Sequence, residues 1–314
     1  MSTQPADPTA LPDSIDRPDE PNARNGFFYA LGAYGLWGLF PLFLKLVEHV
    51  HPAEVVAHRV LWSIPIAGIL IILLRRTADL KRAFASPRIL AMMALTAALV
   101  SVNWGVFVWT IQLNIASQGA LGYYINPLLS VMLGAILLGE KLKRLQWAAI
   151  GLAALAVLLL AVAGGRFPWI ALVLATTFAL YGFFRKTVNI GPTQGFFLET
   201  IILAPVALGY LLWVGNSQGI GGNGLAFASS TSNTLLLLCC GPATAIPLIL
   251  YAFAAKNMRL STLGLMQYIA PTGIFLIAFL VFDEPPEFWT MTAFVLIWSA
   301  LALYSWSAFS GAGE

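Results

Sequence analysis

Charged residues are scarce in this chain, and their scarcity determines the solvent in which it can fold. Asp, Glu, Lys and Arg make up 10% of the 314 residues, hydrophobic residues make up 59%, and the mean hydropathy is +0.81. Because a soluble domain is about 25% charged, too little polar surface exists here to cover a water-soluble globule. The net charge is only +3, and no basic block alternates with aromatics, which argues against a nucleic-acid partner. We therefore expect the lipid bilayer to be the solvent.

Cysteine and histidine are also rare. The two cysteines, Cys239 and Cys240, are adjacent within an apolar run, where neighbours on one helix point in different directions. They therefore predict no disulfide framework and no thiolate metal site. The three histidines lack the spacing of a zinc site. We expect no metal, no cofactor, no catalytic residues and no enzymatic activity.

The first 25 residues differ from the rest in composition. They contain several prolines, few apolar residues and five acids, Asp7, Asp13, Asp16, Asp19 and Glu20. This composition predicts a disordered cytoplasmic tail, because a signal peptide needs an apolar segment behind a basic start. The first membrane helix is then expected to act as the insertion signal.

Ten apolar stretches follow, each of about the length that crosses a hydrocarbon core of ~30 Å. They are continuous runs, whereas the strands of a membrane barrel alternate apolar and polar residues, so we expect helices. The predicted fold is an all-α polytopic membrane protein with spans at about 26–47, 53–74, 88–112, 116–138, 145–163, 167–187, 192–214, 234–255, 260–282 and 287–308.

Lys and Arg concentrate in the loops on one side of these spans. The loops after the second, fourth, sixth and eighth spans hold Arg75, Arg76, Lys81, Arg82, Arg88, Lys141, Lys143, Arg144, Arg185, Lys186, Lys256 and Arg259. The opposite side holds Lys45 and Arg166. By the positive-inside rule both termini are cytoplasmic, and the uncharged loop at about 215–233 is external.

The two halves of the chain carry matching motifs. A shift of 144 positions superposes the segment Leu121–Pro127 on Leu265–Pro271, and Trp37-Gly38 on Tyr181-Gly182. Each half contains five predicted spans, and an odd number makes the second copy enter the membrane from the opposite face. We therefore predict two inverted five-helix repeats, residues 26–163 and 164–310. This architecture places substrate sites near the midplane and suits alternating access.

Two charges stand at equivalent points within these repeats. Arg59 and Glu199 are 140 positions apart, as are Pro65 and Pro205. A charge at the centre of a membrane helix costs about 2.5–3.5 kcal/mol, so we expect both side chains to face the bundle interior near midplane. They could form a structural ion pair, anchor a substrate, or act as a proton-coupled switch. Glu199 is the better proton carrier, because arginine stays protonated in proteins.

Other polar and aromatic side chains share helix faces with these charges and with one another. We predict that they border one central cavity as substrate-pathway residues: Asn103, Trp104, Tyr123, Tyr124, Asn126, Gln267 and Tyr268. The alternative is that their polar groups join helices to each other by hydrogen bonds. Glu140 and Glu284, which close apolar runs at matching positions, are expected to cap or orient helix ends rather than handle substrate.

Several of these motifs together resemble the RarD-type permeases, called chloramphenicol-sensitivity proteins, of the EamA group in the drug/metabolite transporter superfamily. The motifs are Arg59–Ser63, Asn103-Trp104, Leu121–Leu128, Gly139-Glu140, Glu199-Thr200, Leu260–Gly264 and Gln267–Ile269. The resemblance covers about residues 26–308. It implies ten helices in two five-helix repeats in a bacterial inner membrane, and efflux of a small molecule driven by an ion gradient or by exchange.

The expected function is a secondary active transporter, an exporter of small organic metabolites or drugs. An intramembrane lipid-modifying enzyme is the alternative from another class, with Asp283, Glu284 and Glu287 as the only clustered acids it would have. A membrane channel or sensor is a second alternative. The expected partners are a small-molecule substrate and the bilayer, and homodimerisation stays open. The sequence leaves open the substrate, the direction of transport, the coupling ion and whether Arg59 and Glu199 pair.

Overall fold

The computed structural model describes residues 23–75, 77–138, 142–163, 167–222, 224–257, 266–285 and 287–309. Across those ranges the chain is helical apart from its loops and one isolated bridge, Ile220 to Leu225. The helices are α1 (Ala23–Leu46), α2 (Pro52–Leu73), α3 (Thr77–Phe84), α4 (Pro87–Gln112), α5 (Ala116–Leu138), α6 (Arg144–Val162), α7 (Trp169–Thr187), α8 (Pro192–Gln218), α9 (Thr231–Asn257), α11 (Ile269–Leu280) and α12 (Phe288–Phe309). The predicted tail falls on residues outside these ranges, except for its last three.

The apolar helices coincide with the predicted spans. Within the described ranges seven helices are long and apolar enough to cross a membrane, and α7, α11 and α12 contribute shorter apolar stretches. Two details differ from expectation, and a third lies largely outside the described residues. Helix α3, whose eight residues include Asp79, Lys81 and Arg82, was expected to be loop. The loop at about 215–233 is shorter than predicted, because α8 continues to Gln218 and α9 begins at Thr231. Helix α11 begins at Ile269, and the preceding residues 258–265 lie outside the described part.

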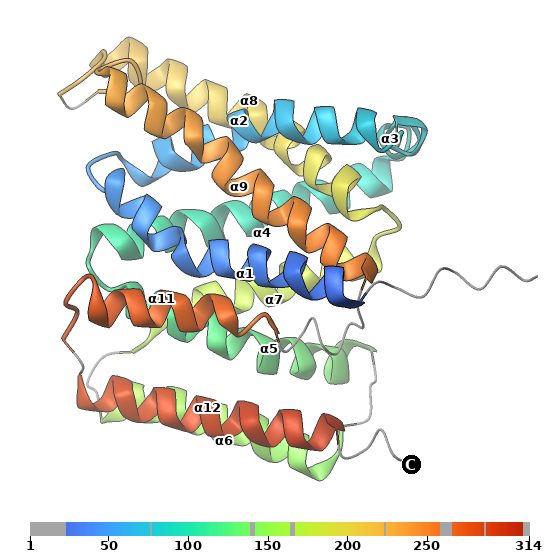
Figure 1. The fold of residues 1–314 in the computed structure, drawn as a ribbon, viewed down its shortest axis with the longest axis vertical. Coiled ribbons are helices and arrows are strands. Elements are labelled where there is room, and N and C mark those ends of the chain that lie inside the picture. The colour runs from blue at the N-terminus through green and yellow to red at the C-terminus, as the bar shows by residue number, and fades with distance from the viewer. Residues whose placement is uncertain are drawn as a thin grey trace, which may run out of the picture.

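The long helices run roughly side by side, stacked from α2 and α8 at one edge to α6 and α12 at the other (Figure 1). Helix α1 packs on α9 and α11, and α7 packs on α4 and α5. Helix α2 packs on α8 and α9, and α8 also packs on α4. The remaining extensive contacts join α5 to α11 and α6 to α12. Each of these pairs joins one of the helices α1 to α6 with one of the helices α7 to α12, so the two halves of the chain pack mainly against each other.

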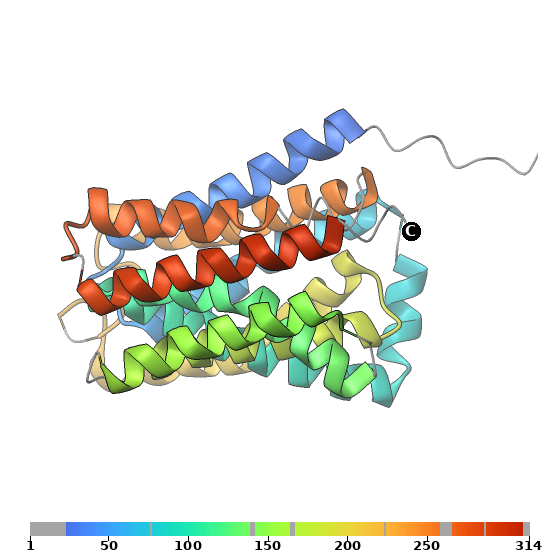
Figure 2. The ribbon, with the colours of Figure 1, turned by 90° about the horizontal axis from the view of Figure 1, so that it is seen from below.

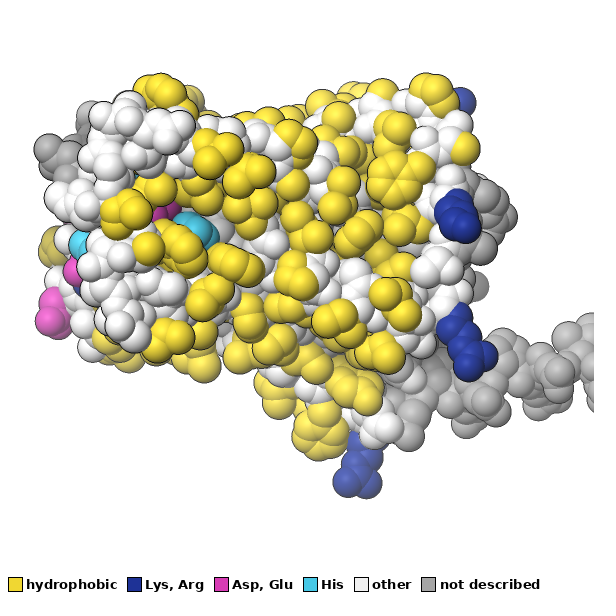
Figure 3. Space-filling model, turned by 90° about the horizontal axis from the view of Figure 1, so that it is seen from above, with side chains coloured by type: hydrophobic (Ala, Val, Ile, Leu, Met, Phe, Trp, Pro, Cys, Tyr) yellow, Lys and Arg dark blue, Asp and Glu magenta, His cyan; other side chains and the backbone are white. Residues whose placement is uncertain are grey.

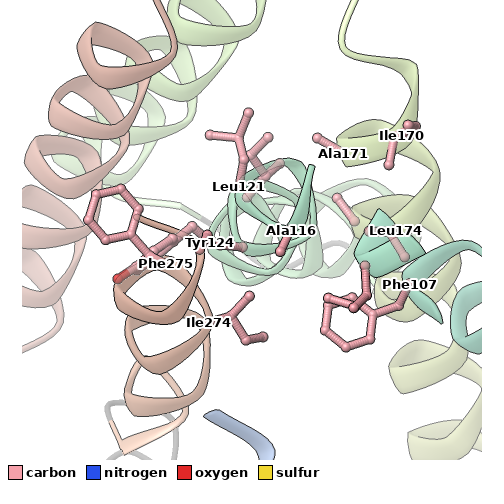
Figure 4. Close-up of a cluster of buried hydrophobic side chains, with 14 of the residues drawn as sticks. Phe107, Ala116, Leu121, Tyr124, Ile170, Ala171, Leu174, Ile274 and Phe275 are labelled. Atoms are coloured by element: carbon pink, nitrogen blue, oxygen red, sulfur yellow. The ribbon is translucent and has the colours of Figure 1, made fainter. Parts of the chain in front are cut away.

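Helix α5 lies at the centre of the apolar core. Its side chains, including Leu121, are held between Leu174 of α7 and Phe275 of α11 (Figure 4). Glycines let the backbones approach: a Cβ on Gly122 would lie 2.8 Å from the carbonyl oxygen of Ala171. Small residues at such contacts are typical of membrane helices, which associate by close packing rather than by the hydrophobic effect.

The face of the bundle seen in Figure 3 is largely apolar, as contact with a bilayer requires. Apart from the buried Arg59 and Glu199, the charged side chains that the structure describes lie toward the two ends of the bundle. One end, which we call the basic end, carries Arg24, Arg75, Lys81, Arg88, Lys143 and Arg144. The other, which we call the acidic end, carries Glu48, Glu54, Asp283, Glu284, Glu287, all three histidines and Lys45. Helix α1 starts and α12 finishes at the basic end (Figure 2).

Candidate functional site

Arg59 is a buried cation with no counter-charge among the residues that the structure describes. Its side chain comes from α2, and the residue is 5% exposed. Its Nε donates to the Thr244 hydroxyl of α9 at 3.0 Å. Its Cζ lies 4.2 Å from the ring centre of Trp104 on α4 and 4.8 Å from that of Phe40 on α1. Its Nη1 is buried and has no hydrogen-bond partner. Four helices therefore hold the guanidinium, yet one of its donors is left unused.

Glu199 is buried too, but it has a cation beside it. This residue of α8 is 2% exposed. The Nε of Arg185, near the end of α7, lies 3.6 Å from its Oε1, and the Tyr181 hydroxyl donates to its Oε2 at 3.2 Å. Arg185 also donates from Nη1 to the sulfur of Met93 on α4, at 3.6 Å. Arg185 does not lie in the loop where its sequence position predicted it: it belongs to α7, and its side chain turns inward to Glu199.

Arg59 and Glu199 stand apart from one another. Each is seven residues after the first residue of its helix, about 10 Å along the axis, but α2 starts at the acidic end and α8 at the basic end. Contacts along α4 also show the separation. Its Trp104 contacts Arg59, and its Met93 contacts Arg185, the partner of Glu199. Trp104 and Met93 are about 16 Å apart along the axis of α4. The structure thus separates the two charges into opposite halves of the bundle rather than joining them at one central point.

Asn103 sits in a closed hydrogen-bond network. Its Nδ2 donates to the Leu174 carbonyl and to the Thr177 hydroxyl, both at 3.0 Å, and its Oδ1 accepts from Tyr123 at 2.9 Å. These bonds join α4, α5 and α7. Asn103 is 0% exposed, so its hydrogen-bonding groups are turned toward neighbouring helices rather than toward open space. This geometry matches the alternative in which Asn103 holds helices together.

The neighbouring Tyr124 contacts α11 and Tyr268 instead of this network. Its hydroxyl is 2.5 Å from that of Thr272, and its ring stacks on Tyr268 at 6.4 Å. Together with Trp298 of α12, these side chains line a groove of about 340 Å³. A larger groove of about 760 Å³ lies between α1 and α9, is mostly apolar, and has Phe40 and Lys45 in its wall.

The remaining predicted pathway residues are Asn126, near the middle of α5, and Gln267, just before α11. Asn126 accepts a hydrogen bond from Ser130 at 3.0 Å and is 9% exposed, and Gln267 is half-buried in the turn before α11. The structure therefore groups Arg59 with Trp104, Asn103 with Tyr123, and Tyr124 with Tyr268. It does not bring all of the predicted residues to one described groove.

Two carboxylates hold the acidic end together. Glu284 accepts hydrogen bonds from the backbone N–H groups of Ala116 at 2.5 Å and Ser117 at 3.0 Å, the first residues of α5. The prediction that Glu284 caps a helix end is confirmed, whereas Glu140 lies outside the described residues. Glu54 likewise accepts from the N–H groups of Ala226 and Phe227 in the loop between α8 and α9. Among the described residues no group of three His, Cys, Asp or Glu side chains is arranged to hold a metal.

Four residues of these sites were not predicted from the sequence: Phe40, Tyr181, Arg185 and Thr244. The sequence does single out Tyr181, because this residue matches Trp37 in the internal repeat. Nothing in the sequence singles out Phe40 or Thr244, because phenylalanine and threonine are common in membrane helices.

Comparison with known proteins decides the family. Residues 24–162 match the model of the EamA-like transporter family. The chain is 43% identical to "Protein RarD" of Streptomyces exfoliatus, over 92% of this chain and 90% of that protein. The chain belongs to the RarD-type EamA-like transporter family. It is also 40% identical to an "Uncharacterized transporter" of Vibrio cholerae, over 92% and 94% of the two chains. The "Chloramphenicol-sensitive protein RarD" of Pseudomonas aeruginosa is 31% identical, over 90% and 94%.

A solved crystal structure shares the fold, with a TM-score of 0.58 at 20% identity, covering 90% of this chain and 98% of that one. As a member of this family with many apolar helices, the protein is a multi-pass inner-membrane transporter of the drug/metabolite superfamily, and not an enzyme.

Proposed function

We propose that this protein is a secondary active transporter that exports small organic metabolites or drugs by alternating access between two inverted five-helix repeats. The observation that carries the proposal is the order in which the helices pack. The first repeat would contain α1, α2, α4, α5 and α6, and the second α7, α8, α9, α11 and α12.

Exchanging each helix for its counterpart turns every extensive contact into another extensive contact. The α1–α9 contact becomes α7–α4, α1–α11 becomes α7–α5, and α2–α9 becomes α8–α4. The α2–α8, α5–α11 and α6–α12 contacts map onto themselves. Such a pattern supports a two-fold axis in the membrane plane, about which two halves of a carrier can rock. A simple channel or a membrane sensor needs no such relation.

The charge distribution supports an orientation with both termini in the cytoplasm. The basic end, where α1 begins and α12 finishes, would face the cytoplasm, since Lys and Arg are retained there. The acidic end would face outward. In this orientation Arg59 lies in the outer half of the membrane and Glu199 in the inner half.

The candidate substrate pathway runs between these two charges. Arg59 and Trp104 form its outer part, and Glu199 its inner part beside Tyr181. Asn126 and Gln267 lie at intermediate depth on α5 and before α11. Asn103, Tyr123, Tyr124 and Tyr268 supply polar and aromatic side chains around that depth. Sparse polar groups among aromatic walls suit small amphiphilic organic molecules.

The experiment that tests the proposal has two stages. Metabolites inside and outside cells that lack the protein are compared with those of cells that overproduce it. An exporter should lower the internal level of its substrate and raise the external one, and the reverse change would contradict export. The compound so found is then tested for counterflow in reconstituted vesicles. A carrier should transiently concentrate labelled substrate against unlabelled substrate on the other side, whereas a channel would only equilibrate it.

A further inference from the structure

Within the described ranges Arg59 lacks a counter-charge, whereas its equivalent in the other half has one. Glu199 has Arg185 beside it, 3.6 Å away. Under the shift that superposes Trp37-Gly38 on Tyr181-Gly182, the position equivalent to Arg185 is Pro41 of α1. The first half therefore has no charge at the position that matches Arg185.

No carboxylate of the described chain reaches Arg59. The acid of its own helix, Glu54, lies more than a turn away, and its two oxygens accept hydrogen bonds from the backbone of Ala226 and Phe227. The partners that Arg59 does have are neutral: the Thr244 hydroxyl and the rings of Phe40 and Trp104. Aromatic rings favour a cation near their faces but do not supply the hydrogen-bond acceptors that a guanidinium can use.

We propose that Arg59 is an anion-binding site, and that the substrate is a small organic anion whose carboxylate or phosphate group takes the unused Nη1 donor. This rests on the proposed transport function and names its substrate class. Guanidinium groups bind oxyanions through paired, charge-assisted hydrogen bonds, and bind them more strongly than neutral acceptors. Phe40 and Trp104 would contact the apolar part of the same molecule.

The position of Arg59 fits a site that opens and closes. Its Nη1 is buried in this conformation, so an anion cannot reach it without movement of the helices that surround it. Of those helices, α1, α2 and α4 belong to the first proposed repeat, and α9 belongs to the second. Rocking of one repeat against the other would therefore change access to the guanidinium.

The test uses purified full-length protein in detergent and four probes: benzoate, its neutral isostere benzamide, phenyl phosphate and inorganic phosphate. Ligands that bind the folded state raise the midpoint of thermal unfolding in a concentration-dependent way. We expect at least one anion to raise the midpoint, while benzamide does not. The two organic anions distinguish carboxylate from phosphate, and inorganic phosphate shows whether the organic part is needed.

Variants assign the effect to Arg59. Arg59→Gln should remove the response to the anion, and Arg59→Lys should weaken the apparent affinity by roughly 10-fold or more, because a lysine cannot bind an oxyanion through two parallel bonds. Arg88→Gln, an exposed arginine at the basic end, is the control and should respond as wild type does. A wild-type protein stabilised by benzamide as well as by benzoate, or by none of the anions, would overturn the proposal. So would an undiminished anion response in Arg59→Gln. If the protein still shows counterflow of a neutral or cationic compound, the substrate class is wrong and the transport function stands.

Discussion

Arg185 lies 3.6 Å from Glu199, between the end of α7 and the first turns of α8. Both members of this buried ion pair come from the second half of the chain, whereas Arg59 of the first half has no acid beside it among the described residues. A Cβ on Gly195 would overlap the Arg185 guanidinium, so the glycine of α8 provides the space that the arginine occupies. In the part of the chain that the structure describes, the two buried sites therefore differ: Glu199 has a cation beside it, and Arg59 has no anion.

The first prediction contrasts the two arginines. Arg185→Met strands the Glu199 carboxylate, and breaking a buried ion pair in this way lowers the free energy of unfolding by about 3–5 kcal/mol. Arg59→Met strands no charge and removes an uncompensated one, so stability should be unchanged or raised. Unfolding in detergent, followed by intrinsic fluorescence, measures both. A loss of stability in Arg59→Met as large as that in Arg185→Met would mean that Arg59 is a structural group.

The second prediction concerns Glu199 as the coupling residue. Glu199→Gln keeps the shape of the side chain and the bond from Tyr181 but removes the titrating group. It should abolish accumulation driven by a pH gradient and leave substrate exchange partly intact. Vesicle uptake of the compound found by the metabolite comparison, with and without a pH gradient, measures this. Unaltered pH dependence in Glu199→Gln vesicles would show that another group couples transport to protons.

Much of the fold could be predicted from the sequence because the bilayer imposes a simple rule. A helix that crosses it must be apolar over about 20 residues, so the spans can be recognised one at a time. Helix α3 was not predicted because this rule does not apply to it: a short polar segment such as Thr77–Phe84 is typical of a loop. The capping role of Glu284 was also predictable, since an acid at the end of an apolar run has few alternatives.

The pairing of the buried charges could not be predicted, because it depends on which helix faces meet. Arg185 is near the end of its span, and residues there usually reach water. Only the packing of α7 against α4 and α8 turns it inward to Glu199. Asn103 illustrates the same point: its helix face is evident from the sequence, but its three hydrogen bonds to α5 and α7 depend on which helices pack beside it.

The third prediction tests the cap on α5. Glu284→Ala leaves the N–H groups of Ala116 and Ser117 without an acceptor, which should lower stability by about 1–3 kcal/mol. Glu287→Ala is the matched control, because that side chain is exposed in the same loop and makes only a 3.5 Å contact with Thr290. Thermal unfolding of the two variants measures the difference. Equal midpoints would contradict the capping role.

The fourth prediction tests the approach of α1 to α11. A Cβ on Gly273 would lie 2.8 Å from the Cα of Gly38, backbone that cannot move aside without separating the helices. Gly273→Ala should therefore lower stability by about 1–3 kcal/mol through overpacking. Gly209→Ala is the control, since nothing in the described structure lies within 4 Å of a Cβ there. If Gly273→Ala is as stable as the control, the two helices are not in close contact.

The central claim is that one pathway opens alternately to the two sides of the membrane. It is tested most directly by single cysteines at Asn126 and Gln267, in a protein whose Cys239 and Cys240 have been replaced. Val206→Cys, exposed on the apolar surface of α8, is the control that an aqueous reagent should not label. Membrane-impermeant thiol reagents are applied to right-side-out and to inside-out vesicles. The account predicts labelling of Asn126→Cys and Gln267→Cys from both sides, without ion leakage across the membrane. Labelling from neither side or from one side only would contradict it.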